Sequence, residues 1–190
     1  MHRKKKYIMT RKTLVLPNGK RLYRIRAIKS MPEIKVYRGD LGGWVEGKHN
    51  LSQNGRCWIF GDAKVYDKAV VRDDAYVLDN ALVFEQAIIE GNALVMNSAV
   101  VCGNAIIAGG TWIEDRALVY GDAMIDGACV QIRGDTIAGS EAQIHKNAYI
   151  TSNAMLEDYL ARHVSALRKN SDKYARSVVR PGVDDDLPFF

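Results

Sequence analysis

Alanine recurs at every sixth position through the middle of the chain, and this spacing constrains the fold more than any other feature. The β-branched aliphatic residues two positions further on keep the same period, from Val65 to Ile125. Most hexads also carry Gly, Asp or Asn four residues after the alanine, as at Asp67 and Gly103. The small-residue series is Ala63, Ala69, Ala75, Ala81, Ala87, Ala93, Ala99, Ala105, Thr111, Ala117, Ala123 and Cys129.

A period of six fits neither a helix, which repeats at 3.6 residues, nor an uninterrupted strand, which repeats at two. It fits a short strand, a corner and another short strand. The alanine and the β-branched residue then point inward with one outward residue between them, and Gly, Asp or Asn tolerates the backbone angles of the corner. Three hexads make one triangular coil, and each coil buries its interior only against its neighbours.

This pattern resembles the left-handed parallel β-helix of the hexapeptide-repeat family over roughly residues 51–150. The preceding segments, GGWV at 42–45, LS at 51–52 and GRCWI at 55–59, resemble those of uncharacterised bacterial and phage proteins of that family. The resemblance implies an all-β, left-handed β-solenoid that commonly assembles as a homotrimer. After Cys129 the inward positions move to Val130 and Ile132, which predicts one extra residue at a corner near 128–130.

Both ends of the solenoid have their own signals. Hydrophobic runs on either side of Asn18-Gly19 predict a β-hairpin cap over Thr13–Ile28, and Trp44 and Trp58 are expected to pack in that cap. An apolar stripe after Ser152-Asn153 predicts a C-terminal α-helix across the last coil. The predicted parts are a basic tail at 1–12, the hairpin and cap at 13–50, the β-helix at 51–152, the helix at 153–170 and a flexible, acidic-tipped tail at 171–190.

Outward residues eighteen apart share a wall of the predicted prism. One column holds Tyr66, Phe84, Cys102 and Tyr120, and another holds Tyr76, Leu94 and Trp112. Apolar walls of this size indicate contact with another surface. Self-association or coverage by the terminal segments is favoured over a stacking platform for bases.

The charge is strongly asymmetric. Thirteen of the 27 Lys and Arg residues lie in residues 1–40, whereas residues 51–152 hold seven basic and thirteen acidic residues. A basic head on an acidic body indicates a polyanionic partner, or a solvated tail that keeps the protein in solution. The residues expected to contact the phosphates of single-stranded DNA are Arg3, Lys4, Lys5, Lys6, Arg11, Lys12, Lys20, Arg21, Arg24 and Arg26.

The chain ends in Asp184, Asp185, Asp186, Leu187, Pro188, Phe189 and Phe190. The run DDDLPF resembles the acidic tip of bacterial single-stranded DNA-binding proteins, which implies recruitment of replication and repair proteins. Phe190 departs from that tip because it adds one residue beyond the expected terminal Phe. The alternative is an acidic tail that folds onto the protein's own basic head.

Evidence for catalysis in the sequence is weak. Many hexapeptide-repeat proteins are acyltransferases with a histidine base, and His145 is the best candidate here, although no Asp or Glu stands at a suggestive spacing. No phosphate loop, metal cluster or cofactor motif is found. The separated cysteines, Cys57, Cys102 and Cys129, indicate neither a disulfide framework nor a zinc site and suit a reducing compartment.

The sequence therefore predicts a cytoplasmic, non-enzymatic scaffold of phage or prophage type, associated with DNA transactions and without a cofactor. No apolar run is long enough for a membrane span, and no secretory signal is expected. An acyl-CoA-dependent acyltransferase and an inhibitor of a host defence protein remain the alternatives.

Overall fold

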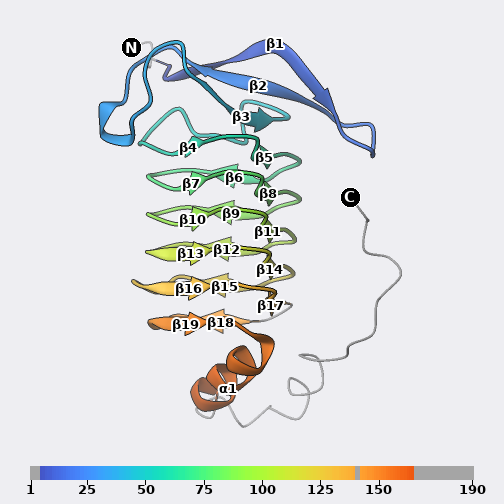
Figure 1. Ribbon diagram of the computed structural model, residues 1–190, viewed down its shortest axis with the longest axis vertical. Helices are drawn as coiled ribbons and strands as arrows, with labels where there is room; N and C mark the ends of the chain where they lie inside the picture. The colour runs from blue at the N-terminus through green and yellow to red at the C-terminus, as the bar shows by residue number, and fades with distance from the viewer. Residues whose placement is uncertain (1–4, 140–141, 165–190) are drawn as a thin grey trace.

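The computed structural model describes residues 5–139 and 142–164 and is a parallel β-solenoid of about six turns. Short strands separated by tight corners stack into three sheets, here called walls 1, 2 and 3 (Figure 1). Wall 1 continues β3 (Leu41–Val45) with β5 (Lys64–Val65), β8 (Leu82–Val83), β11 (Val100–Val101), β14 (Leu118–Val119) and β17 (Ile137–Ala138). The all-β solenoid fold expected from the period is confirmed.

The other two walls are built in the same way. Wall 2 contains β4 (Trp58–Ile59), β7 (Tyr76–Val77), β10 (Leu94–Val95), β13 (Thr111–Ile113), β16 (Val130–Ile132) and β19 (Ala148–Ile150). Wall 3 contains β6 (Val70–Val71), β9 (Ile88–Ile89), β12 (Ile106–Ile107), β15 (Met124–Ile125) and β18 (Gln143–Ile144). Neighbouring strands within each wall are parallel and in register, as in the pairing of Val95 with Val77 and Ile113.

The core is the row of small and β-branched side chains that the period predicted. From Ala63 to Ile125, the alanines and the aliphatic residues two positions later are fully buried, together with Thr111. The corners that separate the strands adopt positive φ angles, with Asp67 at 56° and Gly103 at 71°. Asp and Asn tolerate this left-handed region better than most residues, and glycine adopts it without strain.

Several corner side chains also link one coil to the next. Asp79 Oδ2 accepts the backbone N–H of Asn97 at 3.0 Å, Asn97 Oδ1 accepts that of Asp115 at 3.2 Å, and Asp115 Oδ2 accepts that of Gly134 at 3.0 Å. The Asp and Asn corners therefore combine two properties, a tolerated positive φ angle and a short side-chain acceptor.

The single insertion in the repeat lies where the sequence placed it. Leu94 pairs with Trp112 at a spacing of eighteen, whereas Thr111 pairs with Val130 at nineteen, and Val130 pairs with Ala148 at eighteen again. One extra residue therefore lies between Ile125 and Val130.

The N-terminal end is closed by an antiparallel hairpin. Strands β1 (Tyr7–Val15) and β2 (Arg21–Ala27) pair with each other, and β2 pairs with β3, so the hairpin extends wall 1 beyond the first coil (Figure 1). The predicted turn is present, with Gly19 at a φ of 82°. Strand β1 begins at Tyr7, within the segment 1–12 that was expected to be a tail. A short 3₁₀ turn, η1 (Pro32–Ile34), lies between β2 and β3.

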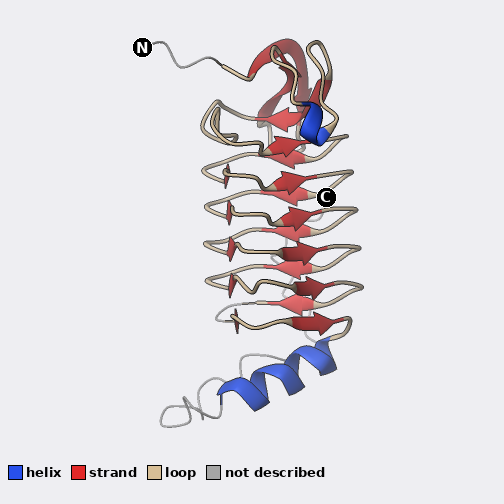
Figure 2. Cartoon of the chain, turned by 90° about the vertical axis from the view of Figure 1, so that its left-hand side faces the viewer, coloured by secondary structure: helices blue, strands red, loops and turns tan. Residues whose placement is uncertain are grey.

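The other end is covered by helix α1 (Asn153–Val164), which lies across the last coil (Figure 2). The Ser152 hydroxyl accepts the N–H of Met155 at 3.3 Å, as the predicted capping residue should. Leu156 is buried and Tyr159 and Leu160 pack against the core. The remainder of the predicted helix, beyond Val164, lies outside the described residues.

Candidate nucleic-acid interface at the basic cap

The hairpin rests on an apolar cluster on the outer side of wall 1. Leu22, Trp44 and Tyr66 are buried in it, and Leu14, Leu16 and Phe84 pack against them. The rings of Tyr66 and Phe84 are stacked with their centroids 5.1 Å apart. Trp58 is also buried and meets Tyr7 edge-on. Both tryptophans therefore serve the cap, as predicted.

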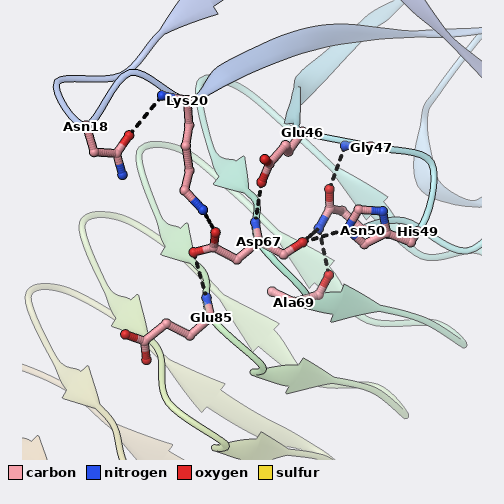
Figure 3. Close-up of polar contacts among 9 residues, drawn as sticks. All are labelled: Asn18, Lys20, Glu46, Gly47, His49, Asn50, Asp67, Ala69 and Glu85. Atoms are coloured by element: carbon pink, nitrogen blue, oxygen red, sulfur yellow. Dashed lines mark hydrogen bonds and ion pairs between the residues drawn. The ribbon is translucent and has the colours of Figure 1, made fainter.

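Asp67 fastens the tip of the hairpin to the first coil (Figure 3). Its carboxylate forms an ion pair with Lys20 and its N–H donates to Glu46 Oε2 at 2.7 Å. Its carbonyl oxygen lies 2.5 Å from His49 Nε2 and accepts the Asn50 amide at 3.0 Å. Lys20 was expected to contact phosphate, but its charge is already engaged within the protein.

Arg24 is also paired internally. Its guanidinium lies 2.6 Å from Asp62 Oδ1 and 5.0 Å from the centroid of the Trp44 ring. The hydrogen bonds from Arg24 and from the Trp44 indole lower the pKa of the Asp62 carboxyl. The Arg24 side chain is half-buried and holds β2 to the first coil.

Lys6, which was expected to contact nucleic acid, is buried in the structure. Its side chain is 3% exposed, and its ammonium donates to the carbonyl oxygens of Asn54, Gly55 and Cys57, the last at 2.8 Å. It also lies 3.1 Å from the Cys57 sulfur. Burial lowers the pKa of the Lys6 ammonium, and Cys57 opposes that shift. The Lys6 ammonium thus donates hydrogen bonds to carbonyl groups at the N-terminal edge of the first coil, where no preceding coil supplies N–H donors.

Five of the predicted residues remain exposed on the cap. Within the described part of the chain none of them takes part in an ion pair, although Lys12 lies 5.9 Å from the Trp44 ring centroid. They are Lys5, Arg11, Lys12, Arg21 and Arg26. Arg3 and Lys4 lie outside the described residues, as do Asp184–Phe190.

Sequence reasoning missed other basic residues of the cap. Lys29, Lys35, Arg38 and Lys48 are all exposed in the connections that follow the hairpin. They carry no motif, and residues 28–50 hold four basic residues against three acidic ones, so local composition did not indicate them either. Over residues 5–50, twelve basic side chains stand against three acidic ones, so the cap is the positive end of the described molecule.

His145 has the acidic neighbour that sequence spacing did not reveal. Its Nδ1 lies 2.6 Å from Asp126 Oδ1 and its Nε2 lies 3.0 Å from Gln143 Oε1, with all three side chains exposed. The pair is nineteen residues apart because the extra residue lengthens this coil. The regular period of eighteen would place Gly127 beside His145, so spacing in the sequence did not indicate Asp126.

No group of three or more His, Cys, Asp or Glu side chains in the described ranges could hold a metal ion. No helix in the same ranges is long and apolar enough to cross a membrane. Neither a known protein-family model nor a curated protein matches this chain.

Proposed function

We propose that the protein is a non-enzymatic β-solenoid scaffold of the left-handed hexapeptide-repeat type whose basic cap binds single-stranded DNA. The observation that carries the proposal is the set of five exposed basic residues on the cap: Lys5, Arg11, Lys12, Arg21 and Arg26. Their charge is not neutralised within the described structure, in contrast to that of Lys20 and Arg24. The acidic body repels a polyanion, which restricts such a partner to this end.

Titration of a labelled single-stranded oligonucleotide, followed by fluorescence anisotropy at several salt concentrations, tests this proposal. Binding should weaken steeply with salt, because each neutralised phosphate releases counterions. The double substitution Arg21→Gln and Arg26→Gln should reduce the slope of log K against log salt by about 1.4 if both residues contact phosphate. Lys68→Gln, an exposed change on the body, is the matched control. Absence of binding at low salt would refute the proposal that the cap binds single-stranded DNA.

We further propose that the acidic tip, Asp184–Phe190, recruits replication or repair proteins. The support is the resemblance of DDDLPF to the tip of single-stranded DNA-binding proteins, with an apolar terminal side chain beside carboxylates that suit Arg or Lys on a partner. Deletion of these seven residues should abolish capture of such proteins from bacterial lysate. Unchanged capture after the deletion would refute the role of the tip.

Self-association through wall 1 is proposed as well. Below the cap this wall presents half-buried Leu82, Val100 and Leu118, and Tyr120 and Ile137 are exposed. A homotrimer would cover this surface, so light scattering after gel filtration should give three chains per particle. Leu118→Lys should shift that mass to a single chain, and a monomeric wild-type protein would contradict the proposal.

The second candidate is an acyl-CoA-dependent acyltransferase, which the contact between His145 and Asp126 favours. A carboxylate on Nδ1 orients an imidazole so that Nε2 can accept a proton from a substrate hydroxyl or amine. In this structure Gln143 lies against that nitrogen and would have to move aside. Calorimetric titration with coenzyme A and loss of turnover in His145→Ala test this candidate, and no binding of the coenzyme removes it.

A further inference from the structure

The lower part of wall 2 differs from every other part of the walls. Its last three strands, β13, β16 and β19, are three residues long, whereas the other coil strands of the described residues from β4 onward have two. Their central residues point outward and lie in one column, because Trp112 pairs with Gln131 and Gln131 with Tyr149. Each of Trp112, Gln131 and Tyr149 is therefore flanked on both sides by a strand residue, and the three together are called the strip.

Two large aromatic side chains are exposed on this strip. Trp112 is 41% exposed and Tyr149 is 54% exposed, whereas Tyr76 and Leu94 in the same column above are half-buried. The two aromatic residues are two coils apart, which corresponds to about 9.6 Å along the solenoid axis. Large aromatic side chains exposed close together on one surface are typical of an interaction site.

A shallow depression of about 300 Å³ adjoins the strip, lined by Cys129, Gln131, Asn147, Ala148 and Tyr149. Asn147 Oδ1 accepts the N–H of Cys129 at 3.1 Å, which fixes the orientation of that amide. The side-chain amides of Gln131 and Asn147 supply both hydrogen-bond donors and acceptors. An aromatic ring beside two amides suits a ligand that has an apolar face and hydroxyl groups at its edge.

The charges around the strip do not suit a polyanion. Arg133 lies 3.2 Å from Glu114 and 3.7 Å from Asp115, and its guanidinium donates to the Tyr149 hydroxyl at 3.0 Å. Its charge is thus balanced by the two carboxylates. The surrounding body carries an excess of acidic residues. Phosphate groups would be repelled here, whereas a neutral ligand would not.

We propose that Trp112, Gln131 and Tyr149 form a binding platform for a neutral, extended β-linked glycan that lies along the solenoid axis. The C–H face of a sugar ring packs against the negative face of an aromatic ring. Alternate sugars of a β-1,4-linked chain present the same face at a repeat close to the two-coil spacing. They would stack on Trp112 and Tyr149, and the intervening sugar would bond to the Gln131 amide.

Titration of the full-length protein with cellohexaose tests the proposal by calorimetry and by tryptophan emission. The chain has three tryptophans, and Trp44 and Trp58 are buried, so a blue shift on binding reports on Trp112. We expect saturable binding that is insensitive to salt and at least about tenfold weaker with cellobiose, which cannot span both rings. Trp112→Ala and Tyr149→Ala should each weaken binding at least about tenfold, whereas Tyr37→Ala, an equally exposed tyrosine on the cap, should not.

Four outcomes would overturn the proposal. The first is no binding of cellohexaose at millimolar concentration, and the second is equal binding by the wild type and the Trp112→Ala variant. The third is a change in particle mass caused by Trp112→Ala, because it would show that a second copy of the chain occupies the strip. Binding of an oligonucleotide that competes with cellohexaose would likewise assign the strip to a different ligand.

Discussion

The body of the solenoid and its N-terminal cap satisfy the same physical requirement in different ways. Within the body, the N–H groups of one coil donate to carbonyl groups of the next, as from Leu82 to Ala99 and from Val100 to Ala117. The first coil has no preceding coil, so side chains donate hydrogen bonds to several of its carbonyl groups. Lys6 donates to three carbonyls of that coil, and the Tyr7 hydroxyl donates to the Leu51 carbonyl at 2.7 Å.

This difference teaches that a basic cap is not the same thing as a basic binding surface. Lys6, Lys20 and Arg24 hold the cap on the body through carbonyl groups or carboxylates. Buried polar groups must find partners, and in the cap several of those partners are charged side chains. Only the remaining exposed residues of the cap are available to a ligand.

The largest expected effect on stability is that of an alanine substitution at a corner glycine of the body, which should exceed that at a turn glycine of the cap. A Cβ on Gly103 would lie 2.5 Å from the Gly121 nitrogen, whereas a Cβ on Gly19 meets nothing within 4 Å. Both have positive φ angles. Gly103→Ala should lower the free energy of unfolding by about 2–5 kcal/mol, and Gly19→Ala by about 1–2 kcal/mol. Urea denaturation measures both, and equal losses would contradict the comparison.

Removing the ammonium of Lys6 should have the next largest effect. Lys6→Met would leave the carbonyls of Asn54, Gly55 and Cys57 without that donor, which should lower the free energy of unfolding by about 2 kcal/mol. Lys5→Met, at the exposed neighbouring residue, is the control and should leave stability unchanged. If the two variants were equally stable, Lys6 would not be a capping residue.

The equivalence of the body corners can be tested with Asp79 and Asp115, which stack in one column. Each has a positive φ and accepts an N–H from the next coil. Alanine at either position should lower stability by about 1–2 kcal/mol, through the lost hydrogen bond and the strained backbone. Asp79→Asn should have a smaller effect because the amide oxygen can accept the same bond. Clearly unequal losses for the two alanine variants would show that the corners are not equivalent.

The smallest expected effect is a loss of cap stability at alkaline pH. Burial raises the pKa of Tyr7 to about 12 from its ordinary value of 10.0. Between these values the unfolded chain binds fewer protons at this residue than the folded one, so stability falls as pH rises. At pH 11 the contribution of Tyr7 should be a loss of about 1 kcal/mol. Tyr7→Phe should remove this component, whereas Tyr37→Phe should retain it.

The sequence was sufficient for the body because its structure depends on local spacing. Ala81 and Val83 are inward for the same reason as every other pair, so one hexad predicts the next. The Asn18-Gly19 turn was also predictable, because its signal lies in two adjacent residues. The start of β1 at Tyr7 was missed because Lys and Arg residues obscure the alternation of the strand.

Contacts between distant residues could not be predicted in this way. The burial of Lys6 depends on carbonyls 48 to 51 residues away, which are unpaired only because the first coil has no predecessor. The contact of His145 with Asp126 requires a spacing of nineteen, and the regular period predicts eighteen. Exposure of Trp112 on a three-residue strand likewise depends on the register of the assembled wall.

The extra residue between Ile125 and Val130 has a consequence for how such a chain can change over evolution. In a globular core an insertion displaces everything packed against it, but here the next coil returns to its usual spacing. Corners therefore act as sites where length can vary without altering the residues that fill the prism. A lineage could acquire a loop or a new surface group at one corner while all other coils retained their structure.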